Sequence, residues 1–162
     1  MIESKKCNKI LSQFEHLPQP PLEKGHLFLG ALGALRKLYL KSNKIGAVVT
    51  VLEEHYYEQE KIRELMGEKK LEHMWVDIKD KAESSLSQHL HPTYQFIRDK
   101  LQHTNVLVHC YMGRSRSATV VIAFLMRERH MTFLAAQKFV KDKRNIINPN
   151  RGFLNDLRQL EK

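Results

Sequence analysis

Two short runs of apolar, β-branched residues limit the folds that this chain can adopt. Residues 45–52 read IGAVVTVL and residues 105–109 read NVLVH. Neither run alternates polar with apolar residues, which indicates strands buried on both faces, as in parallel sheets covered by helices. Stretches with helical spacing separate and follow these strands. The sequence therefore predicts an α/β fold, with a central, mostly parallel twisted sheet flanked by helices.

Periodicity and turn residues predict the remaining elements. Further strands are expected at 26–30 and 71–78, and helices at 31–42, 58–67, 85–101, 117–129, 132–144 and 152–160. Ser85, with Gln88 three residues later, predicts a capping box at the start of the 85–101 helix. Thr132 is expected to cap the helix that follows it. Residues 1–25 contain Pro18, Pro20 and Pro21 with little periodicity, and are expected to form an N-terminal arm.

The size and composition are those of one globular domain. The chain has 162 residues, of which 42% are hydrophobic and 28% charged, enough to bury one core. No apolar run approaches the roughly 20 residues that a membrane span requires, and the first residues lack the apolar core of a signal peptide. The cysteines, Cys7 and Cys110, are too few for a disulfide framework. A reducing compartment is therefore expected: the cytoplasm, with the nucleus as a further location.

The charge is unevenly distributed along the chain. The net charge is +9, and residues 82–162 carry 13 basic and 6 acidic side chains. Most of the basic excess therefore lies in the C-terminal half. An excess of this kind indicates an anionic partner without identifying it.

One segment is suited to binding a tetrahedral oxyanion. It reads VHCYMGRSRS from Val108 to Ser117, so a cysteine ends a strand, a glycine-bearing loop follows, and Arg116 opens a helix. Backbone N–H groups of such a loop converge on one point, where the helix dipole adds partial positive charge. Arg116 can donate to two oxygens of the anion, and Ser117 can donate to the sulfur of Cys110. The same field favours the thiolate of Cys110, which can attack phosphorus.

The pattern HC-x5-RS, from His109-Cys110 to Arg116-Ser117, resembles the signature of cysteine-dependent protein tyrosine phosphatases. The chain is similar to their small, atypical dual-specificity branch over about residues 25–160. The other matching residues are Leu29-Gly30, Asp80, Ala123-Phe124-Leu125-Met126 and Asn150-x-Gly152-Phe153. The resemblance implies the dual-specificity phosphatase fold, with a catalytic domain over residues 26–162.

The resemblance also implies a role for each residue of the loop. Cys110 forms a phosphocysteine that water then hydrolyses, with no metal or cofactor. Arg116 binds phosphate together with the loop residues, which are Tyr111, Met112, Gly113, Arg114 and Ser115. His109 is expected to hold the loop in place, and Asn150 to shape a turn that braces it. Arg144 lies where the family has an arginine that meets a second phosphate or an acidic substrate side chain; a solvated helix face is the alternative.

Two aspartates compete for the role of general acid and base, which the mechanism needs to protonate the leaving oxygen and later to activate water. Asp77 lies in a predicted strand, from which it cannot swing over a substrate. Asp80 lies in the loop that follows and occupies the position of the family's acid. Asp80 is therefore favoured.

The histidines invite a metal interpretation, chiefly His89 and His91 with His103 nearby. Residues two apart on a helix do not share a face, and no CxxC pair accompanies them. Surface histidines are expected, and no metal site is predicted.

The expected substrates are proteins that carry phosphotyrosine or phosphoserine/threonine, acidic or multiply phosphorylated because of the basic excess. The run from Gly113 to Thr119 also resembles the loop of a mitochondrial lipid phosphatase of this superfamily, so phosphoinositide or phosphatidylglycerophosphate headgroups are the alternative substrates. A third hypothesis is an inactive phosphate-binding module, against which Cys110, Arg116 and a candidate acid are all present. Nucleic acid is not expected, because no motif for reading it accompanies the charge.

Overall fold

A five-stranded sheet forms the centre of the molecule. The computed structural model describes residues 7–10, 25–53 and 59–162. Its strands are β1 (Cys7–Lys9), β2 (Leu27–Gly30), β3 (Ile45–Val51), β4 (Glu72–Val76) and β5 (Asn105–His109). They are arranged in the order β1-β2-β5-β3-β4, with β1 antiparallel to β2 and every other pair parallel. This confirms the predicted α/β fold with a mostly parallel sheet.

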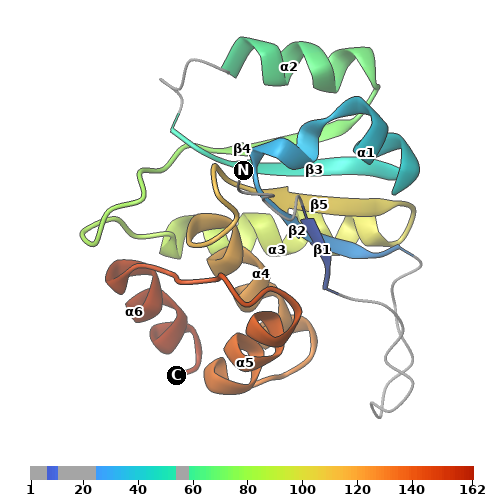
Figure 1. Ribbon diagram of the computed structural model, residues 1–162. Coiled ribbons are helices and arrows are strands. Elements are labelled where there is room, and N and C mark those ends of the chain that lie inside the picture. Colours follow the sequence, from blue (N-terminus) through green and yellow to red (C-terminus); the bar gives the residue numbers. More distant parts are fainter. Residues whose placement is uncertain (1–6, 11–24, 54–58) are drawn as a thin grey trace.

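Helices cover both faces of the sheet (Figure 1). They are the 3₁₀ helix η1 (Leu32–Leu35), α1 (Lys37–Ser42), α2 (Gln59–Glu68), α3 (Ser87–Leu101), α4 (Arg116–Glu128), α5 (Phe133–Lys143) and α6 (Arg151–Leu160). Helices α1 and α2 stand on the other side of the sheet from α4, α5 and α6. Every residue of α4 from Arg116 to Met126 is buried, as expected of a helix enclosed by neighbours on all sides.

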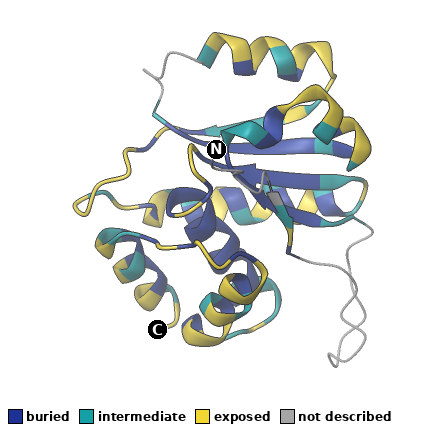
Figure 2. Cartoon of the chain, in the orientation of Figure 1, coloured by how far each residue is buried: buried dark blue, intermediate teal, exposed yellow. Residues whose placement is uncertain are grey.

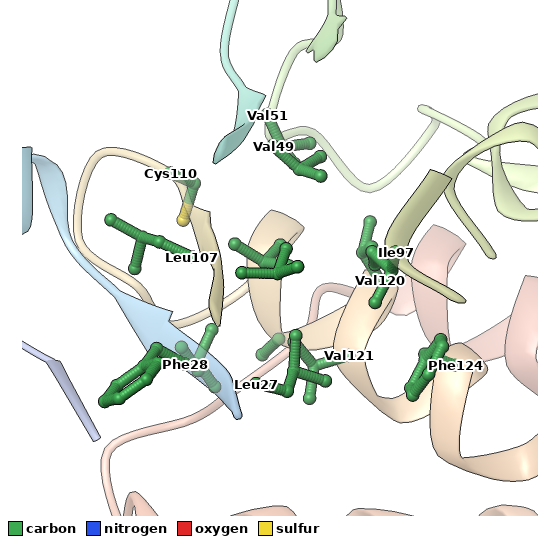
Figure 3. Packing of buried hydrophobic residues seen from close by; sticks show 14 of the residues in the cluster. Leu27, Phe28, Val49, Val51, Ile97, Leu107, Cys110, Val120, Val121 and Phe124 are labelled. Atoms are coloured by element: carbon green, nitrogen blue, oxygen red, sulfur yellow. The ribbon is translucent and has the colours of Figure 1, made fainter. Parts of the chain in front are cut away.

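The hydrophobic core lies between the sheet and α3 and α4. The central strands β3 and β5 are buried along nearly their whole length, while α2 and α5 keep an exposed side (Figure 2). Figure 3 shows Cys110 at the margin of the buried cluster, where β5 runs into the following loop. The strand that delivers Cys110 is therefore held on both edges by neighbouring strands and on its face by the core.

The predicted helix at 31–42 is divided in the structure. Arg36 has extended backbone angles, φ −61° and ψ 133°, and separates η1 from α1. The first turn is drawn toward the Cys110 loop, because the Leu32 N–H donates to the Tyr111 carbonyl at 3.0 Å. Periodicity could not anticipate this interruption, since its cause lies in a loop much further along the chain.

The predicted capping box at Ser85 is wrong. Helix α3 begins at Ser87, and its N-cap residue, Leu86, makes no side-chain cap. Ser85 and Asp156 of α6 share this helix end: the Ser85 hydroxyl accepts from the Ser87 N–H at 3.2 Å, and Asp156 accepts from the Leu86 N–H at 2.6 Å and from the Ser85 hydroxyl at 2.8 Å. The predicted cap at Thr132 is confirmed, because its hydroxyl accepts from the Ala135 N–H at 3.3 Å.

A strand that the sequence did not predict lies in the expected N-terminal arm. Residues 7–9 pair with β2, and the buried Ile10 donates its N–H to the Leu27 carbonyl at 2.8 Å. Pro18, Pro20 and Pro21 lie outside the described residues. Across the described part of the chain, none of the helices has the length and apolar character needed to span a bilayer.

Candidate active site

The loop between β5 and α4 holds Cys110 at the base of a pocket. Cys110 is 1% exposed. Its Sγ accepts hydrogen bonds from the Gly113 N–H at 3.2 Å and from the Ser117 hydroxyl at 3.1 Å. Two donors are therefore directed at one sulfur and fix its position at the base of the pocket.

The carbonyl groups of this loop are bound from outside. The hydrogen bonds are Leu32 N to Tyr111 O (3.0 Å), Arg144 Nη2 to Met112 O (3.2 Å), Arg144 Nε to Gly113 O (2.8 Å) and Asn148 N to Arg114 O (2.8 Å). Because successive carbonyls are held away from the pocket, the intervening N–H groups are free to turn toward it. This is the arrangement of a backbone nest for an anion.

Gly113 makes the loop conformation possible. Its φ is +65°, a region that L side chains rarely adopt. A Cβ at this position would lie 2.5 Å from the Gly30 carbonyl oxygen and 2.8 Å from Arg144 Nη2. The loop therefore needs glycine both for its backbone angle and for its close approach to β2.

Arg116 supplies an unused donor. Its Nη1 donates to the Ile78 carbonyl at 3.3 Å, and its Nε lies 3.7 Å from Asp80 Oδ2. The Nε atom is buried and has no hydrogen-bond partner among the described residues. Buried donors are seldom left unsatisfied, so this N–H marks a place for an oxygen of a bound anion.

Asp80 is held at the rim of the same pocket. Its Oδ1 accepts from the Ser115 hydroxyl at 2.7 Å and from Asn150 Nδ2 at 2.8 Å. Asn150 also caps α6, because its Oδ1 accepts from the Phe153 N–H at 3.1 Å. The structure thus brings Asp80 to the cysteine loop, whereas Asp77 is exposed and does not line the pocket.

The pocket has a volume of about 330 Å³. Its lining residues are Asp80, Cys110, Tyr111, Met112, Arg114, Ser115, Arg116, Asn148 and Asn150. The thiol of Cys110, the guanidinium of Arg116 and the carboxylate of Asp80 therefore meet in one cavity, although Asp80 and Cys110 are far apart in sequence. No group of three potential metal-ligating side chains occurs among the residues described.

Arg144 occupies a different place from the one expected. It is 3% exposed, and its guanidinium donates to the Gly113 carbonyl and, through Nη1, to Asn8 Oδ1 at 2.7 Å. The side chain thus ties the loop to β1, and it also lines a groove that adjoins the pocket. The planar guanidinium group suits this position, because its N–H groups can donate to several acceptors at once.

Three further side chains connect the loop to the far edge of the sheet. The Thr50 hydroxyl lies 2.8 Å from His109 Nε2 and 2.8 Å from His73 Nε2, and His109 Nδ1 lies 3.4 Å from the Cys110 carbonyl. Burial lowers the pKa of His109 to about 3 and that of His73 to about 4. Thr50 and His73 were not predicted from the sequence. Only the strand register, which pairs Thr50 with His109, could have identified these two residues.

The chain is similar to known proteins in sequence and in fold. Residues 27–162 match the family described as "Dual specificity phosphatase, catalytic domain". The chain is 35% identical over 141 residues to dual specificity protein phosphatase 1B of Arabidopsis thaliana, covering 84% of this chain and 78% of the relative. It spans only 18% and 63% of the length of two other curated relatives.

Solved structures agree with the family match. Human DUSP28 superposes with a TM-score of 0.71 at 28% identity, covering 83% of this chain and 90% of that one. The structure of PTPMT1 in complex with PI(5)P gives a TM-score of 0.70 at 27% identity, with coverage of 83% and 89%. With the matched segment spanning both the sheet and the cysteine loop, the chain belongs to the dual specificity phosphatase family.

Proposed function

We propose that this protein hydrolyses phosphate monoesters on phosphotyrosine and phosphoserine/threonine of proteins through a phosphocysteine intermediate. The observation that carries the proposal is the buried Nε of Arg116, which has no hydrogen-bond partner among the described residues and belongs to a side chain that lines the same pocket as Cys110. A phosphoryl group in the nest would accept from this N–H and from the loop amides. Its phosphorus would then lie in front of the thiolate, which is the geometry for nucleophilic attack.

In the first step the Cys110 thiolate attacks phosphorus, and the bond from phosphorus to the ester oxygen breaks. Asp80, at the rim and in its protonated form, donates its proton to the departing oxygen, so the substrate leaves as a neutral hydroxyl group. Arg116 and the loop N–H groups stabilise the charge on the equatorial oxygens. The product of this step is phosphocysteine with Asp80 as a carboxylate.

In the second step water attacks the phosphocysteine. The Asp80 carboxylate accepts a proton from that water, and the sulfur–phosphorus bond breaks to release inorganic phosphate. The Ser117 hydroxyl, 3.1 Å from Sγ, stabilises the thiolate as it leaves. Asp80 returns to its protonated form and the cycle closes without a metal.

A second cavity supports a protein substrate with acidic side chains near the phosphorylated residue. A groove of about 1100 Å³ adjoins the pocket and shares Tyr111, Met112, Arg114 and Asn148 with it. Its wall carries the exposed Lys141 and Lys143. A polypeptide extending from the phosphate could lie along this groove, with its carboxylates near the lysines.

A lipid phosphatase with the same mechanism is the second candidate. The similarity to PTPMT1, whose structure contains PI(5)P, favours it, and so does the basic charge of residues 82–162. Turnover on a doubly phosphorylated peptide is compared with turnover on vesicles that contain a phosphoinositide or phosphatidylglycerophosphate. We expect the peptide to be the better substrate; the reverse order would assign the lipid function.

Hydrolysis of a small aryl phosphate in the presence of a chelator tests the chemistry itself. Wild type is expected to be active and to yield a phosphorylated Cys110 that mass spectrometry detects after rapid acid quenching. Cys110→Ser should be inactive, and Cys7→Ser is the matched control, which should retain full activity. Activity in Cys110→Ser, or loss of wild-type activity on chelation, would overturn the mechanism. Absence of wild-type turnover would favour the inactive phosphate-binding module.

A further inference from the structure

We propose that His73, at the far edge of the sheet, is a positioning residue for the Cys110 loop and acts through the hydroxyl of Thr50. This inference rests on the proposed function, since it concerns the same nucleophile. His73 lies on β4, Thr50 on β3 and His109 on β5. None of these side chains lines the catalytic pocket, so the effect reaches it through hydrogen bonds within the sheet.

The strand register sets the three side chains on one face. Thr50 is paired with His109 across β3 and β5. Val48, two residues before Thr50, is paired with His73 across β3 and β4. Because alternate residues of a strand share a face, His73, Thr50 and His109 point to the same side. The Thr50 hydroxyl lies between the two rings, 2.8 Å from each Nε2.

The direction of these hydrogen bonds follows from the Cys110 carbonyl, which can only accept. His109 Nδ1 faces that carbonyl at 3.4 Å, so it carries the proton. In a neutral imidazole the Nε2 of His109 is then the acceptor, and the Thr50 hydroxyl must donate to it. Having one proton, the hydroxyl can only accept from His73, whose Nε2 therefore carries a proton.

The opposite direction would place two lone pairs face to face. If His109 donated from Nε2 to Thr50, its bare Nδ1 would point at the lone pairs of the Cys110 carbonyl. That arrangement is repulsive and leaves a fully buried ring nitrogen without a donor. The Cys110 carbonyl thus selects the tautomer of His109, and His73, by donating to Thr50, stabilises that tautomer in the way that outer residues orient an inner imidazole.

The surroundings keep both rings neutral, which preserves the single direction. Burial is the main cause of the low pKa of each, about 3 for His109 and about 4 for His73. Arg63 of α2 lowers the pKa of His73 further. For His109 the hydrogen bond to the Cys110 carbonyl raises the pKa, His73 and Arg116 lower it, and burial outweighs each of them. No carboxylate contributes to either pKa. At neutral pH the chain of donors therefore runs from His73 through Thr50 and His109 to the peptide group after Cys110.

The consequence is a restraint on the residue that carries the nucleophile. A donor held at the Cys110 carbonyl fixes the first peptide group of the loop and adds positive potential beside the sulfur. Both effects favour the thiolate and its alignment. Breaking the hydrogen-bonded chain His73–Thr50–His109, called the relay below, should therefore lower kcat. The expected loss is about two- to tenfold, which corresponds to one net hydrogen bond.

The test compares Thr50→Val, His73→Phe and the double variant with wild type. Two rates are followed against pH: alkylation of Cys110 by iodoacetamide, with Cys7→Ser as background, and hydrolysis of a small aryl phosphate. Each single variant should move the alkylation curve to higher pH and lower kcat about two- to tenfold, with KM little changed. The double variant should be no worse than either single variant, because both break one chain. Alkylation needs no turnover, so a protein without phosphatase activity would still report on the relay.

Controls separate the relay from a general loss of stability. Thr93→Val removes a buried hydroxyl on α3 that donates to the His89 carbonyl at 2.8 Å, far from the loop, and should leave both pH curves unchanged. His73→Gln supplies an amide N–H in place of the ring and should restore part of the rate. Nitrogen chemical shifts of the imidazoles should report His109 protonated on Nδ1 and His73 on Nε2. The opposite tautomers, additive losses in the double variant, or unshifted curves in Thr50→Val would each overturn the proposal.

Discussion

Asn150 and Asp80 are joined by a 2.8 Å hydrogen bond across 70 residues of sequence. The same Asn150 caps α6 through its side-chain oxygen and donates its backbone N–H to the Ser115 hydroxyl at 3.2 Å. Ser115 in turn donates to Asp80 at 2.7 Å. A helix terminus, the phosphate loop and the loop that carries the candidate acid therefore form one closed set of hydrogen bonds, and the position of Asp80 depends on all of them.

Asp80→Asn should lower kcat for an alkyl phosphate about a hundredfold or more, because the leaving oxygen loses its proton donor. An aryl phosphate with an acidic leaving group should be less affected. Asp77→Asn is the matched control and should keep near-normal turnover. Steady-state kinetics with both substrates make the comparison, and equal losses in the two variants would remove Asp80 from its role.

Asn150→Ser and Asn150→Ala separate positioning from stability. Serine is also a good N-cap residue, so Asn150→Ser should retain most of the free energy of unfolding yet lose the donor to Asp80, with kcat reduced several-fold. Asn150→Ala should lose the cap as well, at a cost of about 1 kcal/mol. Urea unfolding and kcat are measured on both. A fully active serine variant would show that Asn150 matters only for α6.

Gly113→Ala should disrupt phosphate binding. The added Cβ would meet the Gly30 carbonyl oxygen at 2.5 Å while φ stays at +65°, so the loop must move. We expect a loss of about 1–3 kcal/mol of stability and weaker competitive inhibition by inorganic phosphate. Gly33→Ala, where the new Cβ meets nothing within 4 Å, is the control in the neighbouring 3₁₀ helix. Unchanged phosphate inhibition in Gly113→Ala would contradict the nest.

Acid should destabilise the fold through its buried histidines. The folded-state pKa of His109 is about 3 and that of His73 about 4, against 6.5 for an unperturbed imidazole. Between pH 6.5 and these values the unfolded chain binds protons that the folded chain does not, so stability falls as the pH falls. Each imidazole contributes at most about 1.4 kcal/mol per pH unit.

Urea unfolding at a series of pH values checks this dependence. His73→Gln should flatten the decline between pH 6.5 and about 4, because the variant lacks one of the imidazoles concerned. His103→Gln, at an exposed position, is the control and should leave the slope as it is in wild type. Parallel curves for wild type and His73→Gln would show that protonation of His73 is not a source of the acid sensitivity.

The lysines of the groove should affect extended substrates alone. Lys141→Glu and Lys143→Glu should raise KM for an acidic phosphopeptide about threefold or more at low salt, since they invert charge on the groove wall. Hydrolysis of an aryl phosphate should not change. Lys61→Glu on α2 is the control, because it changes the net charge of the protein by the same amount outside the groove. If all three variants behave alike, the groove does not select the substrate.

Local patterns predicted most of the fold. The runs at 45–52 and 105–109 became β3 and β5, because β-branched residues buried on both faces suit the middle of a parallel sheet. The cysteine loop could be found because strand, glycine turn and helix follow one another directly in sequence. Cys110 and Arg116 consequently lie where that order places them, in a common pocket.

Contacts between distant residues escaped prediction. Asp156 joins Ser85 at the start of α3 in place of the expected capping box, and Arg144 is buried against the loop carbonyls. In each case the partner is set by the packing of a later helix, which spacing along the chain does not encode. His73 and Thr50 became visible only with the strand order, since register decides which side chains meet across a sheet.

The order β2-β5-β3 has a consequence for the growing polypeptide. A ribosome-bound chain that ends before residue 105 contains β2 and β3 but lacks the strand that fills the space between them. Cys110 follows that strand immediately, so its side chain takes its place in the pocket only once the sheet is complete. A nascent chain therefore cannot form the anion-binding loop before β5 has entered the sheet.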